Sequence, residues 1–338
     1  MIQTATNPDA SNVRARRAAL AAFGLCLAIA ASDGCKRSET AAPGAPPASA
    51  AAATTAVPAP DAAPVIREAA EAGKGAWAGL AEPHGLALDG RGRLWVTDFG
   101  HSRVAIFDAA GGTLGGWGGV RGNGPYQLQD PADIAIHGDD VYVADTWNGR
   151  VQHYAISGKF DATTAIELYG PRGVAVAPDG VVWVADSGNN RLALIQAGQP
   201  TRFIGKAGAG ADGLSSPVGL AISPSHVYVA DIGNHRIQVL GLDGKFQRSF
   251  PVAAWKEAME PYLAVDDKDN LYASVPAGST VLALDRSGKV LHSWGADDAG
   301  KKLLKPIGIA LDGKNGILYV ADAASNAVTA IHVAGKKP

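Results

Sequence analysis

One sequence cassette recurs from Pro83 to the end of this 338-residue chain, and it constrains the fold more than any other feature. An alanine marks each copy at Ala87, Ala135, Ala175, Ala221, Ala264 and Ala310, and an aromatic residue follows in step at Trp95, Tyr142, Trp183, Tyr228, Tyr272 and Tyr319. A unit of this length cannot bury its own hydrophobic faces, so such units form a core by stacking on their neighbours. We therefore expect six similar units that pack on one another.

Each copy predicts four short β-strands. In the first copy these are GLALD, RLWVTD, RVAIFD and a glycine-bounded TLGGW, with turn-forming runs such as DGRG and DAAGG between them. Strands such as DVYVAD and VVWVAD carry apolar residues on both faces, so both faces of each sheet have to be covered. Sheets that pack face to face around an axis satisfy this requirement. The sequence predicts an all-β, six-bladed β-propeller of four-stranded antiparallel blades.

The runs VADSGNNR, VADIGNHR and VADTWNGR resemble the NHL repeat, as does PRGVAVAPDG before the first of them. The resemblance covers roughly residues 70–338 and implies a six-bladed propeller of the NHL/TolB-like type. The last copy ends after its third strand, AVTAIHV. By counting strands, we expect the segment near Pro64 to Glu68 to supply the fourth strand and close the ring.

Composition narrows the possible partners. The formal net charge is only −2, and no long run of Lys and Arg lies beyond the N-terminal segment, so we expect no nucleic-acid partner. The only two cysteines, Cys26 and Cys35, both precede the repeats. The folded body can therefore hold neither a disulfide nor a thiolate metal site.

The first 35 residues predict a signal peptide. Arg14, Arg16 and Arg17 precede an apolar stretch from Ala18 to Ala31, which is too short to span a bilayer comfortably, because ~20 residues are needed. The next run, SDGC, is similar to the lipobox of bacterial lipoproteins, which implies lipidation of Cys35 and a membrane anchor. Two alternatives stay open: cleavage after the small-x-small run AIA, which would release a soluble protein, and an uncleaved anchor helix.

Residues 36–64 are almost entirely Ala, Pro, Ser, Thr and Gly, with too few large apolar side chains to offset the entropy of ordering. The predicted organisation is a signal and lipobox-like segment at 1–35, a disordered linker at 36–64 and the propeller at 65–338. The protein would then lie in the cell envelope, lipid-anchored and facing the periplasm or the exterior. The alternative is a secreted, soluble protein.

A charged pair with members five residues apart recurs in four copies. The pairs are Asp98 with Arg103, Asp145 with Arg150, Asp186 with Arg191, and Asp231 with Arg236. Recurrence in blade after blade favours a structural role over a ring of charge for a ligand. We expect each carboxylate to accept N–H groups of its own turn between the second and third strands while the arginine covers it. Ser274 and Ser279 take these places in the fifth copy.

His84 is the histidine of most interest. The stretch LAEPHGLALDGRGRLWVTD is similar to the first blade of peptidyl-α-hydroxyglycine α-amidating lyase, an NHL-type propeller that holds zinc with three histidines, each after a proline, and His84 matches one of them. The equivalent positions in the other copies are Ala132, Arg172, Val218, Pro261 and Ile307. Zinc needs three or four converging ligands, so we expect no metal and no other cofactor.

Function is expected on the face that carries the turns between second and third strands and the connections from fourth to first strands, because these are the longest loops. Exposed Trp, Tyr and Arg residues often anchor interfaces. The candidates there are Arg121, Tyr126, Trp147, Asn148, Trp255 and Lys256, with His84 and Arg172 at the mouth of the central channel. The two tryptophans have an alternative role as blade caps.

The sequence thus favours a non-catalytic binding or scaffold propeller that presents this face to a protein, a peptide or a glycan. The alternative is a propeller enzyme, a lyase or a lactonase-like hydrolase, that acts at the channel mouth near His84 and Arg172. No nucleophile elbow, metalloprotease helix or phosphate-binding loop in the sequence supports the enzyme.

Overall fold

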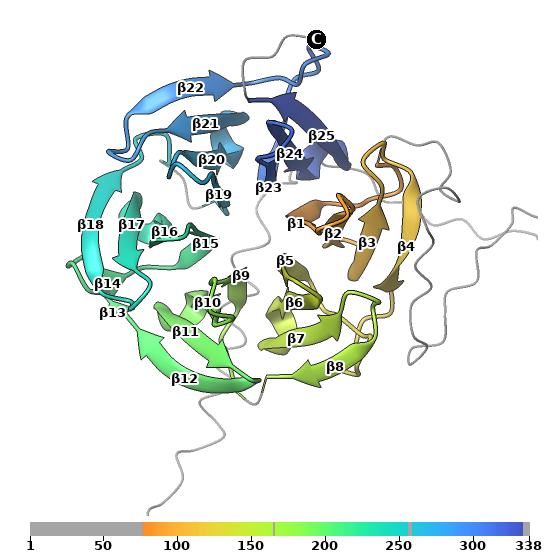
Figure 1. The fold of residues 1–338 in the computed structure, drawn as a ribbon, viewed down its shortest axis with the longest axis horizontal. Helices are drawn as coiled ribbons and strands as arrows, with labels where there is room; N and C mark the ends of the chain where they lie inside the picture. The colour runs from red at the N-terminus through yellow and green to blue at the C-terminus, as the bar shows by residue number, and fades with distance from the viewer. Residues whose placement is uncertain (1–76, 165, 256–258, 334–338) are drawn as a thin grey trace, which may run out of the picture. The chain divides into compact units, whose positions relative to one another are not determined.

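The computed structural model describes residues 77–164, 166–255 and 259–333, and in this part of the chain six β-sheets stand as blades around a central axis (Figure 1). The predicted all-β, six-bladed propeller is confirmed. The signal and lipobox-like segment with Cys35, the linker and Lys256 lie outside the described residues. No helix in the described part is long and apolar enough to cross a membrane.

Blades one to three each contain four antiparallel strands, and the first strand of each lies nearest the axis (Figure 1). Their strands are β1 (Pro83–Leu88), β2 (Leu94–Asp98), β3 (Arg103–Phe107) and β4 (Thr113–Gly118); β5 (Pro131–His137), β6 (Asp140–Asp145), β7 (Arg150–Ala155) and β8 (Phe160–Thr163); and β9 (Pro171–Val176), β10 (Val182–Asp186), β11 (Arg191–Gln196) and β12 (Gln199–Ile204).

Blades four and five repeat this order, and a short parallel pair precedes them in the connection from blade three. The strands are β13 (Lys206–Ala207) and β14 (Gly213–Leu214) in the connection; β15 (Pro217–Ile222), β16 (His226–Asp231), β17 (Arg236–Gly241) and β18 (Phe246–Pro251) in blade four; and β19 (Leu263–Val265), β20 (Leu271–Val275), β21 (Thr280–Leu284) and β22 (Val290–Trp294) in blade five.

Blade six has three strands in the described part of the chain, β23 (Pro306–Asp312), β24 (Ile317–Asp322) and β25 (Ala327–His332). The segment expected to add a fourth strand, Pro64 to Glu68, lies outside the described residues, so ring closure by it stays a prediction. In blades two to six, one turn of 3-10 helix links the second and third strands, at Thr146–Asn148, Ser187–Asn189, Ile232–Asn234, Pro276–Gly278 and Ala323–Ser325.

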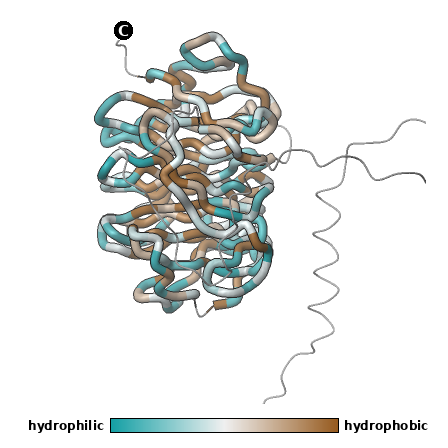
Figure 2. Tube along the Cα trace, turned by 90° about the vertical axis from the view of Figure 1, so that its right-hand side faces the viewer, coloured by the Kyte–Doolittle hydropathy of each residue, from teal (hydrophilic) through white to brown (hydrophobic). Residues whose placement is uncertain are grey.

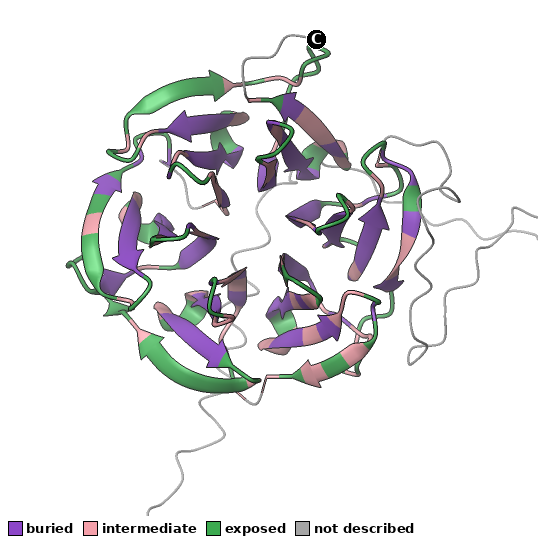
Figure 3. Cartoon of the chain, viewed as in Figure 1, coloured by how far each residue is buried: buried purple, intermediate pink, exposed green. Residues whose placement is uncertain are grey.

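The hydrophobic core lies between the blades rather than inside any one of them. Trp95 and Ile106 of blade one, for example, pack in one cluster with Val141 and Tyr154 of blade two, and all four are fully buried. Inner strands are mostly buried and the outermost strands largely exposed (Figure 3). Seen edge-on, hydrophobic segments gather inside the ring and hydrophilic ones in the turns (Figure 2). Each blade therefore depends on its neighbours for burial.

Close contact near the axis depends on glycine as well as on the repeated alanine. A Cβ atom added to Gly308 would lie 1.7 Å from the carbonyl oxygen of His84, and one added to Gly173 would lie 2.1 Å from that of Val218. Both separations are far below van der Waals contact. The inner strands of neighbouring blades thus touch through backbone at these glycines, which lie two residues before the alanine of their copies.

Candidate functional site

We call the end of the propeller that carries the turns between second and third strands and the connections from fourth to first strands the loop face. The four Asp/Arg pairs lie there, and all four aspartates are fully buried. The Nε atoms of Arg103, Arg150, Arg191 and Arg236 lie 2.6, 2.7, 2.7 and 2.8 Å from Oδ2 of Asp98, Asp145, Asp186 and Asp231. Each arginine thus neutralises a desolvated carboxylate.

The second carboxylate oxygen binds a different loop from the one expected. Instead of a backbone N–H group of its own turn, Oδ1 accepts the backbone N–H of a residue in the preceding connection, at 2.7 Å in every case. The donors are Ala81, Gln129, Tyr169 and Ser215. Each pair therefore joins two loops that are distant in sequence, and it fixes the position of the loop that leads into the blade.

Asn148 belongs to the same structural device. Its Nδ2 lies 2.8 Å from Oδ2 of Asp145 and 2.7 Å from the carbonyl oxygen of Gly122, to both of which it donates. Asn189 and Asn234 make the equivalent 2.8 Å bond in blades three and four. A side chain engaged in this way has little left for a ligand, so Asn148 positions the loop face.

Blade five departs from the expected register by one residue. The strand pairing places Val275 opposite Thr280, where blades one to four pair Asp with Arg, rather than Ser274 with Ser279. The Oγ atom of Ser274 instead accepts the N–H of Tyr262 at 2.8 Å. Blade five therefore has no Asp/Arg pair, because Val275 and Thr280 take the two positions.

Trp147 differs from its counterparts in every other blade. Its N–H donates to the carbonyl oxygen of Gln129 at 3.1 Å, as the N–H groups of Gly100, Gly188 and Gly233 do to their own preceding connections. At the equivalent turn position the other copies have Gly100, Gly188, Gly233, Ala277 and Ala324. The indole is 44% exposed. The turn thus keeps its backbone bond while it presents a large aromatic side chain to solvent.

Arg121 binds the loop to which the Trp147 turn is hydrogen-bonded. Both Nη atoms of its guanidinium bind the Asp130 carboxylate, Nη1 at 2.9 Å from Oδ1 and Nη2 at 3.0 Å from Oδ2. The Arg121 side chain is 54% exposed. Asp130 follows Gln129, the residue to which Trp147 is bonded. Trp147, Arg121 and Val120 are thus exposed residues on two loops of the loop face that a backbone hydrogen bond joins.

Two other candidates are half-buried or buried. Tyr126 is half-buried, and its hydroxyl accepts the N–H of Phe160 at 2.9 Å. Trp255 is only 3% exposed, and its Nε1 donates to the carbonyl oxygen of Ser274 at 3.0 Å. This tryptophan packs blade five and does not belong to an exposed surface. Lys256 is outside the described residues.

The structure brings His84 and Arg172 together through Glu260. Oε1 of Glu260 lies 2.7 Å from Nη1 of Arg172, and Oε2 lies 3.8 Å from Nδ1 of His84. The three side chains come from the axial ends of blades one, three and five. Glu260 was not identified from the sequence. The signal that could have identified it is its position, because the other five copies have proline there: Pro83, Pro131, Pro171, Pro217 and Pro306.

His84 is neutral under ordinary conditions. Its side chain stacks on Phe99 with ring centroids 4.1 Å apart, and burial lowers its pKa from 6.5 to about 4, with Glu260 acting in the opposite direction. Neither Nδ1 of His84 nor Oε2 of Glu260 has a hydrogen-bond partner among the described residues. The channel mouth therefore has two buried polar atoms that could bind a further group, Nδ1 of His84 and Oε2 of Glu260.

Two further departures from the repeat lie close by. Asp133 and Tyr262 occupy positions that are glycine in the other four copies. Burial raises the pKa of the Asp133 carboxyl to about 8, although Oδ2 accepts the N–H of Val174 at 2.9 Å. The Tyr262 hydroxyl donates to the carbonyl oxygen of Ala132 at 3.2 Å. In the described part of the chain, no three His, Cys, Asp or Glu side chains gather as a metal site.

Comparison with known proteins identifies NHL repeats in the first three blades. The model of the NHL repeat matches residues 80–107, 128–154 and 168–193, which are the first three strands of blades one and two and most of those of blade three. E3 ubiquitin-protein ligase NHLRC1 of Mus musculus is 31% identical over 151 residues. That alignment covers 44% of this chain and only 37% of the mouse protein, so the two share a repeat region rather than their whole lengths.

Solved structures give the same fold at lower identity. A gluconolactonase from Xanthomonas campestris is 18% identical with a TM-score of 0.58, over 81% of this chain and 96% of that one. Virginiamycin B lyase from Staphylococcus aureus is 15% identical with a TM-score of 0.52, over 75% of this chain and 85% of that one. Identities this low show a shared fold alone.

Proposed function

This chain belongs to the NHL-repeat β-propeller family, and we propose that it is a non-catalytic binding propeller that receives a partner protein on its loop face. The observation that carries the proposal is the exposure of Trp147 at a turn position that is glycine or alanine in the other blades. The part of Trp147 that is left in solvent adds nothing to the packing of the blade. Selection for contact with another molecule accounts for it.

The surroundings of Trp147 suit an interface. Arg121 and Val120 are exposed in the connection to which the Trp147 turn is bonded, and the Asp145–Arg150 pair with Asn148 fixes both loops. A surface that is already ordered loses little conformational entropy on binding. We therefore assign Trp147 as the anchor, with an apolar or aromatic side chain of the partner against the indole and polar contacts around it.

The alternative, an enzyme at the channel mouth, has weaker support. A general base works best when its pKa lies near the operating pH. Burial holds the pKa of His84 at about 4, and the Glu260 carboxylate is engaged by Arg172 at 2.7 Å. Both features suit a neutral or paired role better than proton transfer. One stoichiometric divalent ion whose removal abolished an activity would contradict the binding proposal.

The place of action proposed from the N-terminal sequence is the cell envelope, with Cys35 as a lipid anchor. Mass spectrometry of the mature N-terminus tests this directly. A diacylated cysteine at position 35 is the expected result. A free N-terminus after Ala30 would instead indicate a secreted, soluble protein.

The binding proposal is tested by cross-linking in the native cell. A photoreactive amino acid replaces Trp147 in one full-length variant and Phe246 in a control, because Phe246 is also exposed but lies on the outer strand β18. We expect a discrete protein adduct from position 147 only. No adduct at 147, or the same adducts from both positions, would defeat the proposal, and a glycan adduct would correct the partner class.

A further inference from the structure

The interface between blades two and three lacks the large side chain that the fourth strands of blades one, three, four and five place at the equivalent interfaces. Thr164 lies opposite Val151. Its N–H donates to the carbonyl oxygen of Val151 at 3.0 Å, and its Oγ1 accepts the N–H of Val151 at 3.1 Å. The residues at the equivalent place in blades one, three, four and five are Trp117, Ile204, Phe250 and Trp294. Large apolar groups at this place stabilise the ring, so a threonine there is not explained by the fold.

A second departure lies beside the first. His153 pairs with Tyr142 across β6 and β7, and the equivalent positions in the other blades are Ile106, Leu194, Val239, Ala283 and Ala330. Tyr142 is in turn only half-buried, whereas the other five repeat aromatics are buried. Blade two has thus exchanged apolar filling for a polar lining.

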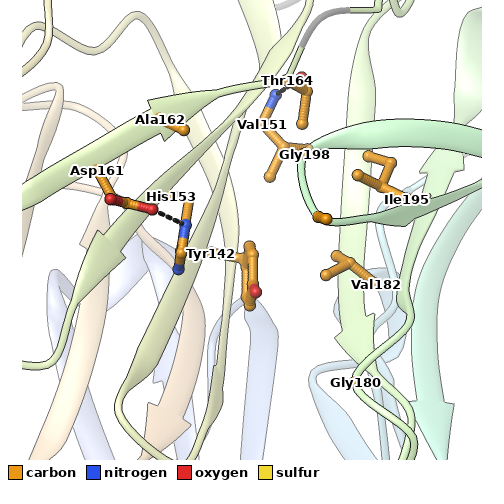
Figure 4. Close-up of a pocket in the computed structure, with 11 residues that line it drawn as sticks. Tyr142, Val151, His153, Asp161, Ala162, Thr164, Gly180, Val182, Ile195 and Gly198 are labelled. Carbon is orange, nitrogen blue, oxygen red and sulfur yellow. Dashed lines mark hydrogen bonds and ion pairs between the residues drawn. The ribbon is translucent and has the colours of Figure 1, made fainter.

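These exchanges leave a cavity of about 240 Å³ between blades two and three, and its lining includes Gly180 and Gly198 in turns at the end opposite the loop face. Tyr142 lies between His153 on one side and Val182 on the other, with Ile195 above Val182 (Figure 4). A cavity of ~150 Å³ with apolar walls is large enough to take a benzene ring. The space therefore admits one aromatic ring with a short substituent.

The polar side of the cavity carries negative charge. His153 stacks on Tyr142 with centroids 4.6 Å apart, and its two ring nitrogens lie 2.8 Å from carboxylate oxygens of Asp140 and Asp161. Asp161 lines the cavity, and its side chain is 64% exposed. Burial, and then the charges of these two aspartates, raise the pKa of Tyr142 above 10.0. A cation is favoured in such surroundings, and an anion is not.

We propose that this cavity binds a small organic cation made of one aromatic ring and a short arm that carries an ammonium group. The ring occupies the space that Trp or Phe fills in other blades and lies against the face of Tyr142 that His153 leaves free. The ammonium group pairs with Asp161. Trp147, Arg121 and Val120 do not line this cavity, and the site does not depend on the partner proposed for the loop face.

Calorimetric titration of the full-length protein with tryptamine tests the proposal, with indole-3-acetate as the anion of the same ring. We expect saturable binding of tryptamine with one site per chain, and binding of indole-3-acetate at least tenfold weaker. No binding of tryptamine at millimolar concentration would overturn the proposal. Equal affinity for the two compounds would also overturn it, because the carboxylates would then contribute nothing.

Two variants locate the site. Thr164→Trp restores the residue of blades one and five, and it should raise the melting temperature while it abolishes tryptamine binding. Asp161→Asn should keep the fold and weaken the binding of tryptamine at least fivefold. The binding of indole, which has no ammonium group, should change little. Wild-type tryptamine affinity in either variant, or a lower melting temperature in Thr164→Trp, would show that the ring and the ammonium group do not bind as proposed.

Discussion

Arg150 holds the buried carboxylate of Asp145, with its Nε 2.7 Å from Oδ2 and only 13% of the arginine side chain exposed. Burial raises the pKa of the Asp145 carboxyl even though Arg150 and Asn148 act in the opposite direction. The pair is thus a desolvated one, in which loss of one partner leaves the other uncompensated. Its value to the protein is positional, because it joins the Trp147 turn to the loop that carries Arg121.

Arg150→Gln should therefore be strongly destabilising. We expect a loss of about 3–5 kcal/mol, since breaking a buried pair leaves a charge without compensation. Urea denaturation followed by tryptophan fluorescence measures it. Arg121→Gln is the matched control, because Arg121 also pairs with a carboxylate but its side chain is 54% exposed. This variant should lower the free energy of unfolding by under about 1 kcal/mol. Equal losses in the two variants would contradict the structural role.

Asp133→Asn should remove a pH dependence of stability. The folded carboxyl has a pKa of about 8 against 3.8 as the ordinary value, so between these values the folded protein binds more protons than the unfolded chain. Wild-type stability therefore falls as pH rises through this window and levels off above it. The variant, whose amide oxygen can still accept the Val174 N–H, should lack this fall. Parallel wild-type and variant curves between pH 5 and pH 9 would be the contrary result.

His84 should stay neutral in the folded protein until about pH 4, because burial lowers its pKa from 6.5. Below pH 6.5 His84 binds a proton in the unfolded chain but not in the folded protein, so the free energy of unfolding decreases as pH falls toward 4. A shift of this size corresponds to at most about 3 kcal/mol. Titration of the His84 ring signals by NMR checks the direction, and a midpoint above 6.5 would refute it.

Ring closure by the segment near Pro64 to Glu68 predicts a sharp boundary for truncation. Removal of residues 1–60 should leave the melting temperature unchanged. Removal of residues 1–74 should lower it by several degrees, because β25 would then have no fourth strand to pair with. A gradual decline across both truncations, or none in either, would count against closure by this segment.

The repeat was sufficient to predict the blades because the alanine and aromatic positions recur in step with the strands. The Asp/Arg pairs were also visible at their constant spacing. Their second contact was not, because Oδ1 of Asp145 reaches Gln129, 16 residues earlier in the chain, across a loop with no repeated sequence. Such a bond depends on the path of the connection, which local patterns do not specify.

Candidate site residues were harder to predict, because residue type alone does not decide exposure. Trp147 and Trp255 are both loop tryptophans, yet one is 44% and the other 3% exposed. Comparison of equivalent positions is more informative. Glu260 in place of proline is a departure that the six aligned copies reveal, and Thr164 in place of a large apolar residue is one that the fourth strands of blades one to five reveal. Both lie at the sites argued above.

The central claim is that Trp147 anchors a partner on the loop face. The most direct test is the affinity of purified full-length protein, with Trp147→Gly, for the partner recovered by cross-linking at position 147. We expect at least tenfold weaker binding with an unchanged melting temperature, as for a hot-spot residue at a turn position that tolerates glycine elsewhere. Phe246→Ala should bind as the wild type does. Wild-type affinity in Trp147→Gly would contradict the account.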